Sequence, residues 1–281
     1  MLKKIPLIEM GNPKYDFSSF SELDFYKKVN TRLIELAEVD KLAKIIELGC
    51  GTGGVTELIL DRVNSAKNTV IYAIDSSASA ISSSLSRLES RKEAILKFIQ
   101  TEAQNLQSTV KDQVDSVIYC NSIHYINNKM DMINQIGKSL KSGGTFAFNT
   151  SFYSGSHPPE TEIFLRKWMF KTIRLLKQRY GIMPVKKGKV ESRVQLTPEN
   201  YTELVLSNGF YIKDKEVIEV DVPLDGWYHI CSFRDWIEGV LPGVPLSKGK
   251  EILQETVKDL FDEMNIKTLQ RNWLSVVAVK K

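Results

Sequence analysis

The sequence predicts an α/β fold, with a doubly wound, mostly parallel sheet of seven strands and helical insertions that cap it. Short runs rich in Ile, Val, Phe and Tyr alternate with longer segments of helical periodicity between residues 40 and 150. Such alternation is typical of a parallel sheet with helices on both faces. Two later segments are too long for simple connections, which usually take about two to six residues. We therefore expect them to form additional helices.

Composition restricts the class of protein. The 281 residues are 42% hydrophobic and 26% charged, which excludes a disordered or fibrous chain. The three cysteines lie far apart, so neither a disulfide framework nor a zinc site is predicted, and we expect no other metal site. No signal peptide is evident, and no segment approaches the roughly 18 apolar residues of a membrane span. We expect a cytoplasmic protein.

The first half of the chain supplies five of the expected strands and the helices between them. A helix is expected at residues 21–37, before the sheet begins. Ser77 is placed to cap one later helix, and Gly143 supplies a left-handed exit from another. The expected strands are residues 44–48, 70–74, 96–100, 114–120 and 144–149, and the helices between them are 55–63, 79–89 and 130–140.

The second half completes the sheet and adds a cap. Thr197-Pro198-Glu199 is typical of a helix start, and strands are expected at 217–222 and 273–279. We interpret the long segments as helical insertions over the carboxyl edge of the sheet. The expected organisation is a single domain: an N-terminal helix and lid (1–39), a core (40–150), cap insertions (151–196 and 223–272) and the rest of the core sheet (197–222 and 273–281).

A glycine-rich loop follows the first expected strand. Gly49, Gly51 and Gly54 fit the spacing G-x-G-x-x-G, which is found in dinucleotide sites. Glu47, two residues before the first glycine, would repel a pyrophosphate but attract a ligand with an ammonium or sulfonium group. A cationic cofactor is favoured, and a nicotinamide-dependent oxidoreductase remains an alternative.

The segment E-L-G-C-G-T-G-G resembles the first motif of class I S-adenosylmethionine-dependent methyltransferases of the small-molecule type. Later segments match further motifs of that family in order, at residues 73–77, 101–103, 114–125 and 140–146. The resemblance covers about residues 40–150. It implies a Rossmann-like methyltransferase fold and S-adenosyl-L-methionine as the cofactor.

The same resemblance implies roles for single residues. Asp75 ends the second strand, where the family holds the ribose hydroxyls with an acid. Glu102-Ala103 resembles the family's acid-Ala pair, whose acid reaches the adenine amino group, although Asp is commoner there. Asn121 is expected at the amino-acid end of the cofactor. The cofactor site implied in this way consists of Glu47, Gly49, Cys50, Gly51, Asp75, Ser76, Glu102, Ala103 and Asn121.

Catalytic candidates are fewer, because methyl transfer from a sulfonium is an in-line displacement in which positioning supplies about 7–11 kcal/mol. A base is required only if the acceptor must lose a proton. His124, just past the fourth strand, is a candidate base or else a packed histidine, and His229 is a second candidate. Trp227 and Tyr228 are candidates for an acceptor pocket, or they belong to the core of the cap. Tyr15 lies where the family often places a lid, or in a disordered tail.

Positive charge is concentrated in one expected helix, residues 160–180. Nine basic residues and no acidic ones lie between residues 163 and 190, in a chain whose net charge is only +4. This helix is either a solvated face or a contact for an anionic substrate, an acidic carrier protein, a membrane surface or nucleic acid. The basic residues opposite its apolar face are Arg166, Lys167, Arg174 and Lys177.

The leading functional hypothesis is methyl transfer to a small molecule, either free or bound to a carrier protein. One alternative is an RNA or protein methyltransferase that uses the basic helix. No RNA-binding module is recognisable, and the Asn/Asp-Pro-Pro-aromatic signature is absent, which argues against a nucleic-acid partner. A non-catalytic sensor that binds S-adenosylmethionine is the other alternative.

Overall fold

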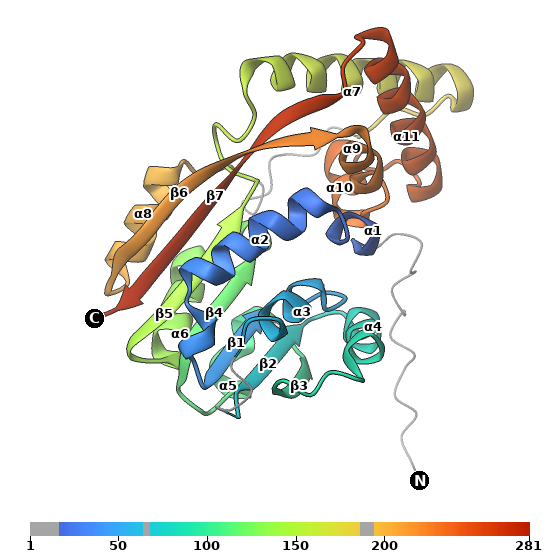
Figure 1. Cartoon of the computed structure of the whole chain (residues 1–281). Helices are drawn as coiled ribbons and strands as arrows, with labels where there is room; N and C mark the ends of the chain where they lie inside the picture. Colours follow the sequence, from blue (N-terminus) through green and yellow to red (C-terminus); the bar gives the residue numbers. More distant parts are fainter. Residues whose placement is uncertain (1–16, 64–67, 186–193) are drawn as a thin grey trace.

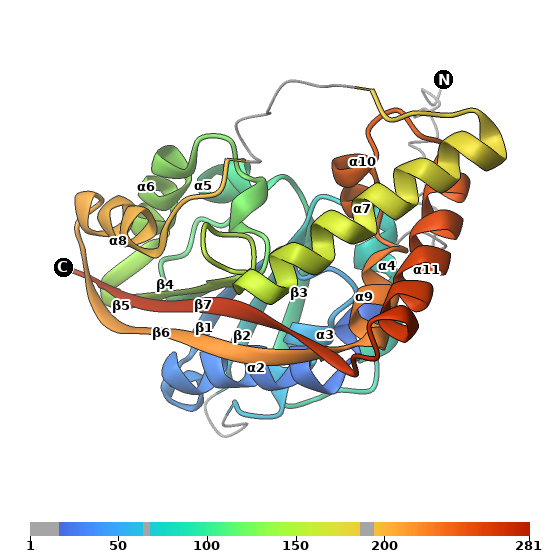
Figure 2. The same ribbon diagram turned by 90° about the horizontal axis from the view of Figure 1, so that it is seen from above.

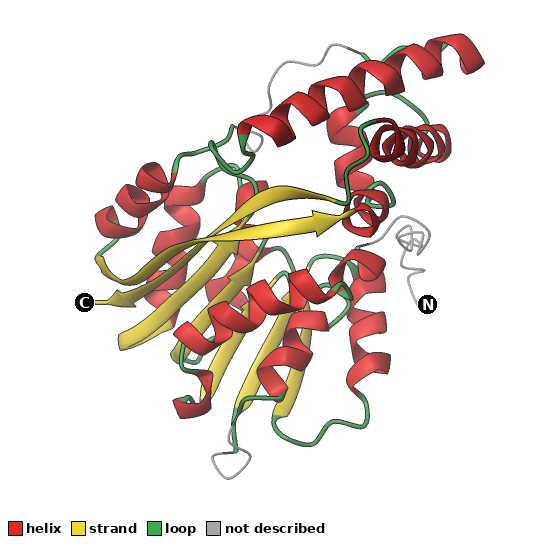
Figure 3. Ribbon diagram, turned by 45° about the horizontal axis from the view of Figure 1, so that its top comes forward, coloured by secondary structure: helices red, strands yellow, loops and turns green. Residues whose placement is uncertain are grey.

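The computed structural model describes residues 17–63, 68–185 and 194–281, and within them it shows a seven-stranded sheet of order β3-β2-β1-β4-β5-β7-β6. All neighbouring pairs from β3 to β5 are parallel, whereas β7 runs antiparallel to both β5 and β6. Helices lie on both faces of the sheet (Figure 3), so the predicted fold class is confirmed. The strands are β1 (Lys44–Leu48), β2 (Val70–Asp75), β3 (Ile95–Gln100), β4 (Val114–Cys120), β5 (Leu140–Thr150), β6 (Phe210–Pro223) and β7 (Thr268–Lys280).

The central strands are buried because helices cover both of their faces, as their apolar sequences predict. Apolar side chains of α5, α6 and α8 pack on one face, and those of α2, α3 and α4 pack on the other. These helices are α2 (Asp24–Leu36), α3 (Gly54–Leu60), α4 (Ala78–Leu88), α5 (Leu106–Thr109), α6 (Lys129–Ser139) and α8 (Pro198–Ser207).

Local sequence signals fix several helix ends as predicted. The Ser77 hydroxyl caps α4 by accepting a hydrogen bond from the Ala80 amide at 3.3 Å. Thr197 begins α8 with a capping box that it shares with Asn200. The predicted helix exit at Gly143 was wrong, because α6 ends at Ser139 and the extended Leu140 already begins β5. Gly143 has φ +73° inside the irregular start of β5, a left-handed conformation that glycine adopts without steric cost.

The β6–β7 hairpin is longer than predicted. Its pairing runs from Phe210 opposite Lys280 to Pro223 opposite Thr268. Beyond Thr150, where β5 ends, the hairpin continues into the cap (Figure 1). The prediction was too short because β6 is an edge strand with alternating exposed residues, many of them charged, and so lacks the continuous apolar run of a buried strand.

The predicted cap consists of α7 (Pro159–Tyr180), α9 (Leu224–Ile230), α10 (Arg234–Val240) and α11 (Leu246–Glu263). Helices α7 and α11 lie side by side (Figure 2), and the indole of Trp168 donates between them to the Leu253 carbonyl at 3.2 Å. The short helix α1 (Ser18–Ser21) and the start of α2 join the same apolar cluster through Phe20 and Tyr26. Among the described helices, none is both long and apolar enough to cross a membrane.

Candidate functional site

A pocket of about 570 Å³ lies at the carboxyl ends of β1, β2 and β4. This edge is where open α/β sheets bind ligands, and the volume is in the range of small-molecule sites, about 300–1,000 Å³. Residues of α1, α2 and the start of α10 line its other side, so the cap and the N-terminal helices form one wall of the pocket. The predicted residues that line it are Gly49, Cys50, Gly51, Asp75, Ser76, Glu102, Ala103 and Asn121.

The glycine loop gives this pocket a backbone wall. Gly49 and Gly51 have φ +67° and +53°, a region that residues with a side chain rarely adopt. A Cβ atom on Gly49 would lie 3.1 Å from the Ser122 hydroxyl oxygen, whereas one on Gly51 would meet nothing within 4 Å. Open space above Gly51 therefore allows a ligand to approach the main chain closely.

Asp75 joins the glycine loop to the end of β2. Its Oδ2 atom accepts a hydrogen bond from the Gly51 amide at 2.9 Å, and its Oδ1 atom accepts one from the Ser77 amide at 2.8 Å. Each carboxylate oxygen has a second lone pair for a further donor. Asp75 is therefore oriented before any ligand binds and can still accept hydrogen bonds from hydroxyl groups in the pocket.

Asn121 is held by a chain of buried amides. It has φ +47°, and its backbone N–H lies 2.9 Å from the Asn149 Oδ1 atom. The Asn149 side chain donates to the Asn30 Oδ1 atom in α2 at 2.8 Å, and the Asn121 Oδ1 atom accepts from the Ser151 amide at 3.0 Å. Helix α2, the ends of β4 and β5 and the pocket wall are linked in this way.

Glu47 lies inside the protein, outside the set of described residues that line the pocket. Its side chain is only 1% exposed and accepts a 2.6 Å hydrogen bond from the Thr56 hydroxyl. Burial raises the pKa of Glu47 to about 7. Direct contact between Glu47 and the cofactor stays a prediction.

His124 is buried beside the pocket. Its Nδ1 atom lies 3.2 Å from the Thr150 hydroxyl, and its ring is 4.2 Å from the ring of Tyr125, which lines the pocket. Burial, with a smaller contribution from the charge of Arg271, lowers the pKa of His124 to about 3. The neutral imidazole is a weak base, and the contacts favour a role in positioning Tyr125.

Of the other predicted acceptor and catalytic residues, the three that are described do not line this pocket. Trp227 is 1% exposed in the cap core, and Tyr228 lies under the Lys258 ammonium, 4.3 Å from its ring centroid. His229 is in the same helix and is not among the described lining residues. Tyr15 falls outside the described residues. The side chains of Trp227 and Tyr228 in α9 pack in the cap, and the residues that follow α9, Phe233 and Arg234, line the pocket instead.

Sequence reasoning missed several pocket residues. Phe233 lies 5.2 Å from Phe17, ring centroid to centroid, and these two aromatic side chains close the pocket from the cap and from the N-terminal segment. No local motif pairs them, because their contact forms only where the segment before α1 meets the segment after α9. The lining residues that were missed include Ser21, Tyr26, Tyr125, Phe233 and Arg234.

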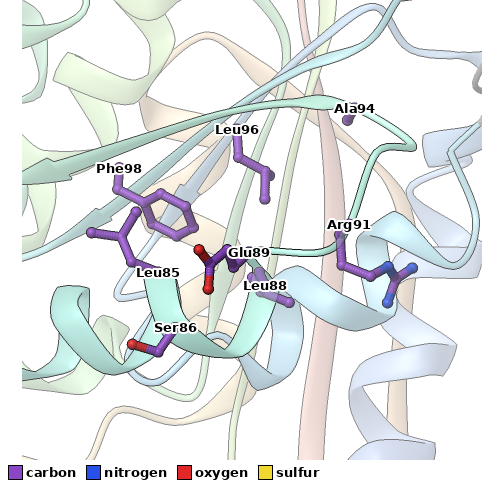
Figure 4. Close-up of a pocket in the computed structure, with 8 residues that line it drawn as sticks. All are labelled: Leu85, Ser86, Leu88, Glu89, Arg91, Ala94, Leu96 and Phe98. Carbon is purple, nitrogen blue, oxygen red and sulfur yellow. The ribbon is translucent and has the colours of Figure 1, made fainter.

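A second hollow of about 380 Å³ lies between α4 and the edge strand β3 (Figure 4). Apolar side chains line it together with Ser86 and Glu89, and the one cation among its described lining residues, Arg91, is already paired with Glu93 and Asp61. Ala94 and Leu96 place it toward the amino end of β3, away from the carboxyl edge. No chemistry is assembled there.

The methyltransferase-domain family model matches residues 39–196, which contain the glycine loop and the strand ends that form the pocket. The chain belongs to this family. The resemblance to class I S-adenosylmethionine-dependent methyltransferases is thereby confirmed, and with it the enzyme class and the cofactor, S-adenosylmethionine.

Named relatives of the methyltransferase are distant. It is 23% identical to malonyl-[acyl-carrier protein] O-methyltransferase 1 of Ilyobacter polytropus over 269 residues, 92% of this chain and 89% of that protein. It is 27% identical to malonyl-[acyl-carrier protein] O-methyltransferase of Acetivibrio thermocellus over 150 residues, 53% of this chain. This second match spans 50% of the relative's own length. Among solved structures, loganic acid methyltransferase with SAH has a TM-score of 0.68 at 11% identity, over 96% of this chain and 98% of that one. At such low identity this likeness shows the fold alone.

Proposed function

We propose that the methyltransferase moves the methyl group of S-adenosylmethionine to a small-molecule acceptor, either free or held on a carrier protein. One observation carries the proposal. The glycine loop and the Asp75 carboxylate are joined by a 2.9 Å hydrogen bond in a pocket with one wall formed by the cap and the N-terminal helices. A long polymer would need an open groove, whereas this pocket favours an acceptor of modest size.

The residues present fit the cofactor. Gly51 leaves room for a ligand against the main chain, and Asp75 retains lone pairs for the ribose hydroxyls. Glu102 lines the same pocket at the adenine side implied by the resemblance, and Asn121 lines the side expected for the amino-acid end. When bound, S-adenosylmethionine supplies an electrophilic methyl group on a sulfonium.

The protein contributes position and enclosure. The amide chain through Asn149 fixes Asn121, and the packing of His124 fixes Tyr125 at the wall. Phe17 and Phe233, which pack on each other, give this pocket an apolar wall. Because His124 is a weak base, the arrangement favours an acceptor atom that needs no help in losing a proton.

Helix α7 supplies the observation that favours a carrier-bound acceptor. Lys171 and Arg179 form ion pairs with acidic residues of α11. One exposed face of α7 instead combines Ile163 and Phe170, which is 71% exposed, with cations that form no ion pair in the described part of the chain. We call this the α7 basic face, and its cations are Arg166, Lys167, Arg174 and Lys177.

An acidic carrier domain would complement the α7 basic face in charge, and the two exposed apolar side chains would give it a contact centre. The name of the relatives, malonyl-[acyl-carrier protein] O-methyltransferase, supports the same class of acceptor. We propose that α7 is the docking helix for such a carrier.

The test uses S-adenosylmethionine labelled in its methyl group. The label is expected in a malonyl thioester on an acyl carrier protein, or in a carrier-free malonyl thioester if the α7 basic face has no docking role. Label in RNA would support the alternative substrate class. Binding of NAD with no binding of S-adenosylmethionine, measured by tryptophan fluorescence, would overturn the proposal. Tight cofactor binding without transfer to any acceptor would indicate a sensor.

A further inference from the structure

Arg271 is a buried cation in the part of β7 that extends into the cap. Its side chain is 7% exposed, and its Nη2 atom donates to the Ser151 carbonyl at 3.2 Å. The guanidinium carbon lies 5.3 Å from the ring centroid of Trp273 and 6.0 Å from that of Trp227. The Nε atom is buried, and no described residue accepts a hydrogen bond from it.

Three further nitrogens around Arg271 are buried without a partner in the described parts of the chain. They are the indole Nε1 atoms of Trp227 and Trp273 and the Nε2 atom of His157, whose ring is 6.4 Å from that of Trp227. By contrast, the indole of Trp168 in the same cap donates to Leu253 and Thr256. We call Arg271, Trp227, Trp273 and His157 the buried donor cluster.

Buried polar groups nearly always have hydrogen-bond partners, and an unsatisfied one destabilises the fold. Several such groups in one place therefore indicate a binding partner from outside the described chain. A group with acceptor atoms only, such as a carboxylate, can satisfy several donors at once.

The charge of the cluster indicates which acceptor fits. No ion pair joins Arg271 to any acidic residue within the described ranges, and desolvation lowers its pKa to about 10. The guanidinium therefore stays protonated at neutral pH, while burial lowers the pKa of His157 to about 3 and keeps that ring neutral. One positive charge in a planar fork matches a carboxylate, whereas a phosphate dianion would need a second cation.

The buried donor cluster lies outside the described lining of the pocket, and hydrogen bonds through Ser151 connect it to that lining. The Ser151 carbonyl accepts from Arg271, and the Ser151 amide donates to the Asn121 side chain, which lines the pocket. The charge of Arg271 also acts on His124, which packs against Tyr125 at the pocket wall. Ser151 and Asn121 thus connect the guanidinium to the expected amino-acid end of the cofactor.

We propose that the buried donor cluster is the receptor for a carboxylate group of the methyl acceptor. The inference rests on the proposed function, because it assigns the substrate class of the same site. It also gives a reason for an arginine that has no carboxylate partner in the described parts of the chain, beside an otherwise apolar cap core.

The test follows the indole N–H signals by ¹H–¹⁵N NMR in the full chain saturated with S-adenosylhomocysteine. Sodium acetate is the probe, and sodium chloride and acetamide are the controls for ionic strength and for shape. We expect acetate alone to shift the Trp227 and Trp273 signals in a saturable way. The Trp168 signal is the internal reference, because its N–H already has protein acceptors.

Arg271→Gln is expected to weaken the acetate response at least tenfold, since a charge-assisted contact is lost. The matched control is Arg32→Gln, which removes the same charge from an exposed ion pair with Glu216. Its response should equal that of the wild type. Because a buried cation without a counter-ion opposes folding, Arg271→Gln should keep or raise Tm.

The inference is overturned if acetate shifts the two indole N–H signals no more than chloride does, or if folded Arg271→Gln keeps the full shift. Either result would show that these donors bind only water. If Arg271→Gln does not fold, Trp227→Phe and Trp273→Phe decide, because each removes one N–H and keeps the charge. Unchanged acetate affinity in both overturns the inference, and a severalfold loss supports it. Calorimetry with S-adenosylhomocysteine separates the two proposals: lost cofactor binding contradicts the proposed function, whereas intact binding without an acetate response contradicts only the carboxylate receptor.

Discussion

Replacing Asp75 with alanine is the most direct test of the cofactor site. The substitution removes the carboxylate that joins the end of β2 to the glycine loop by accepting a hydrogen bond from the Gly51 amide at 2.9 Å. It also removes the acceptor of the Ser77 amide at 2.8 Å. Both effects act at the pocket wall, so the fold is expected to persist while the cofactor site loses its anionic end.

The magnitude follows from the hydrogen bonds at stake. A hydrogen bond to a charged group contributes roughly 1.5–3 kcal/mol, and the resemblance gives Asp75 two ribose hydroxyls to hold. Water entering the space left by the carboxylate will offset part of this. The full loss of one such bond raises the dissociation constant about tenfold, because a change of 1.4 kcal/mol in binding free energy corresponds to a factor of about ten. We expect Asp75→Ala to weaken the Kd for S-adenosylhomocysteine at least tenfold.

Isothermal titration calorimetry measures the Kd, and circular dichroism verifies the fold. The matched control is Asp262→Ala, which removes an exposed aspartate from α11 and should leave the Kd unchanged. Asp75→Asn keeps the shape and one oxygen acceptor and should fall between wild type and Asp75→Ala. A folded Asp75→Ala protein with the wild-type Kd would refute the assignment of Asp75 to the cofactor.

Three further predictions concern other parts of the site. His124→Ala should lower kcat only a few-fold, because an imidazole with a pKa of about 3 is a poor base at pH 7; a loss of about a hundredfold with unchanged cofactor affinity would restore the general-base role. Burial raises the pKa of Glu47 from 4.5 to about 7, so the folded protein binds a proton that the unfolded chain releases. The free energy of unfolding of the wild type should therefore fall relative to that of Glu47→Gln as pH rises from about 4.5 to 7, by up to about 3 kcal/mol. The same difference in unfolding free energy between the two proteins at pH 5 and at pH 8 would contradict this. Replacing the four cations of the α7 basic face with Gln should lower kcat/KM for a carrier-bound acceptor at low salt and converge on the wild type at high salt, whereas parallel salt curves would show that this face is only solvated.

Much of the site was predictable because its signals are local. Two strands can be recognised from the residues next to them in sequence: one is followed by glycines, and the other ends in Asp75. Parallel strands then bring their carboxyl ends to one edge whatever the rest of the chain does, which is why Asp75 and Gly51 meet. The helix starts at Ser77 and Thr197 are equally local, since a cap bonds within three residues of itself.

The acceptor side could not be predicted in this way. Trp227 and His229 are prominent in the sequence, yet the structure turns α9 so that Phe233, a few residues later, reaches the pocket. Arg271 carries no motif, and the sequence analysis places it in the cap insertion 223–272 rather than in a strand. Its burial, its missing counter-ion and its contact with Ser151 arise only when β7 extends past β5 into the cap.

The sequence by itself therefore determined the sheet, the glycine loop and the cofactor, since these depend on backbone conformation and on residues close together in the chain. Only the tertiary structure decided which cap residues reach the pocket and which surround Arg271, because those contacts join residues more than a hundred positions apart, such as Arg271 and Ser151, or Phe233 and Phe17. Hydrophobic packing of the cap selects among such pairings, and it depends on the shape of the whole cap rather than on any local pattern.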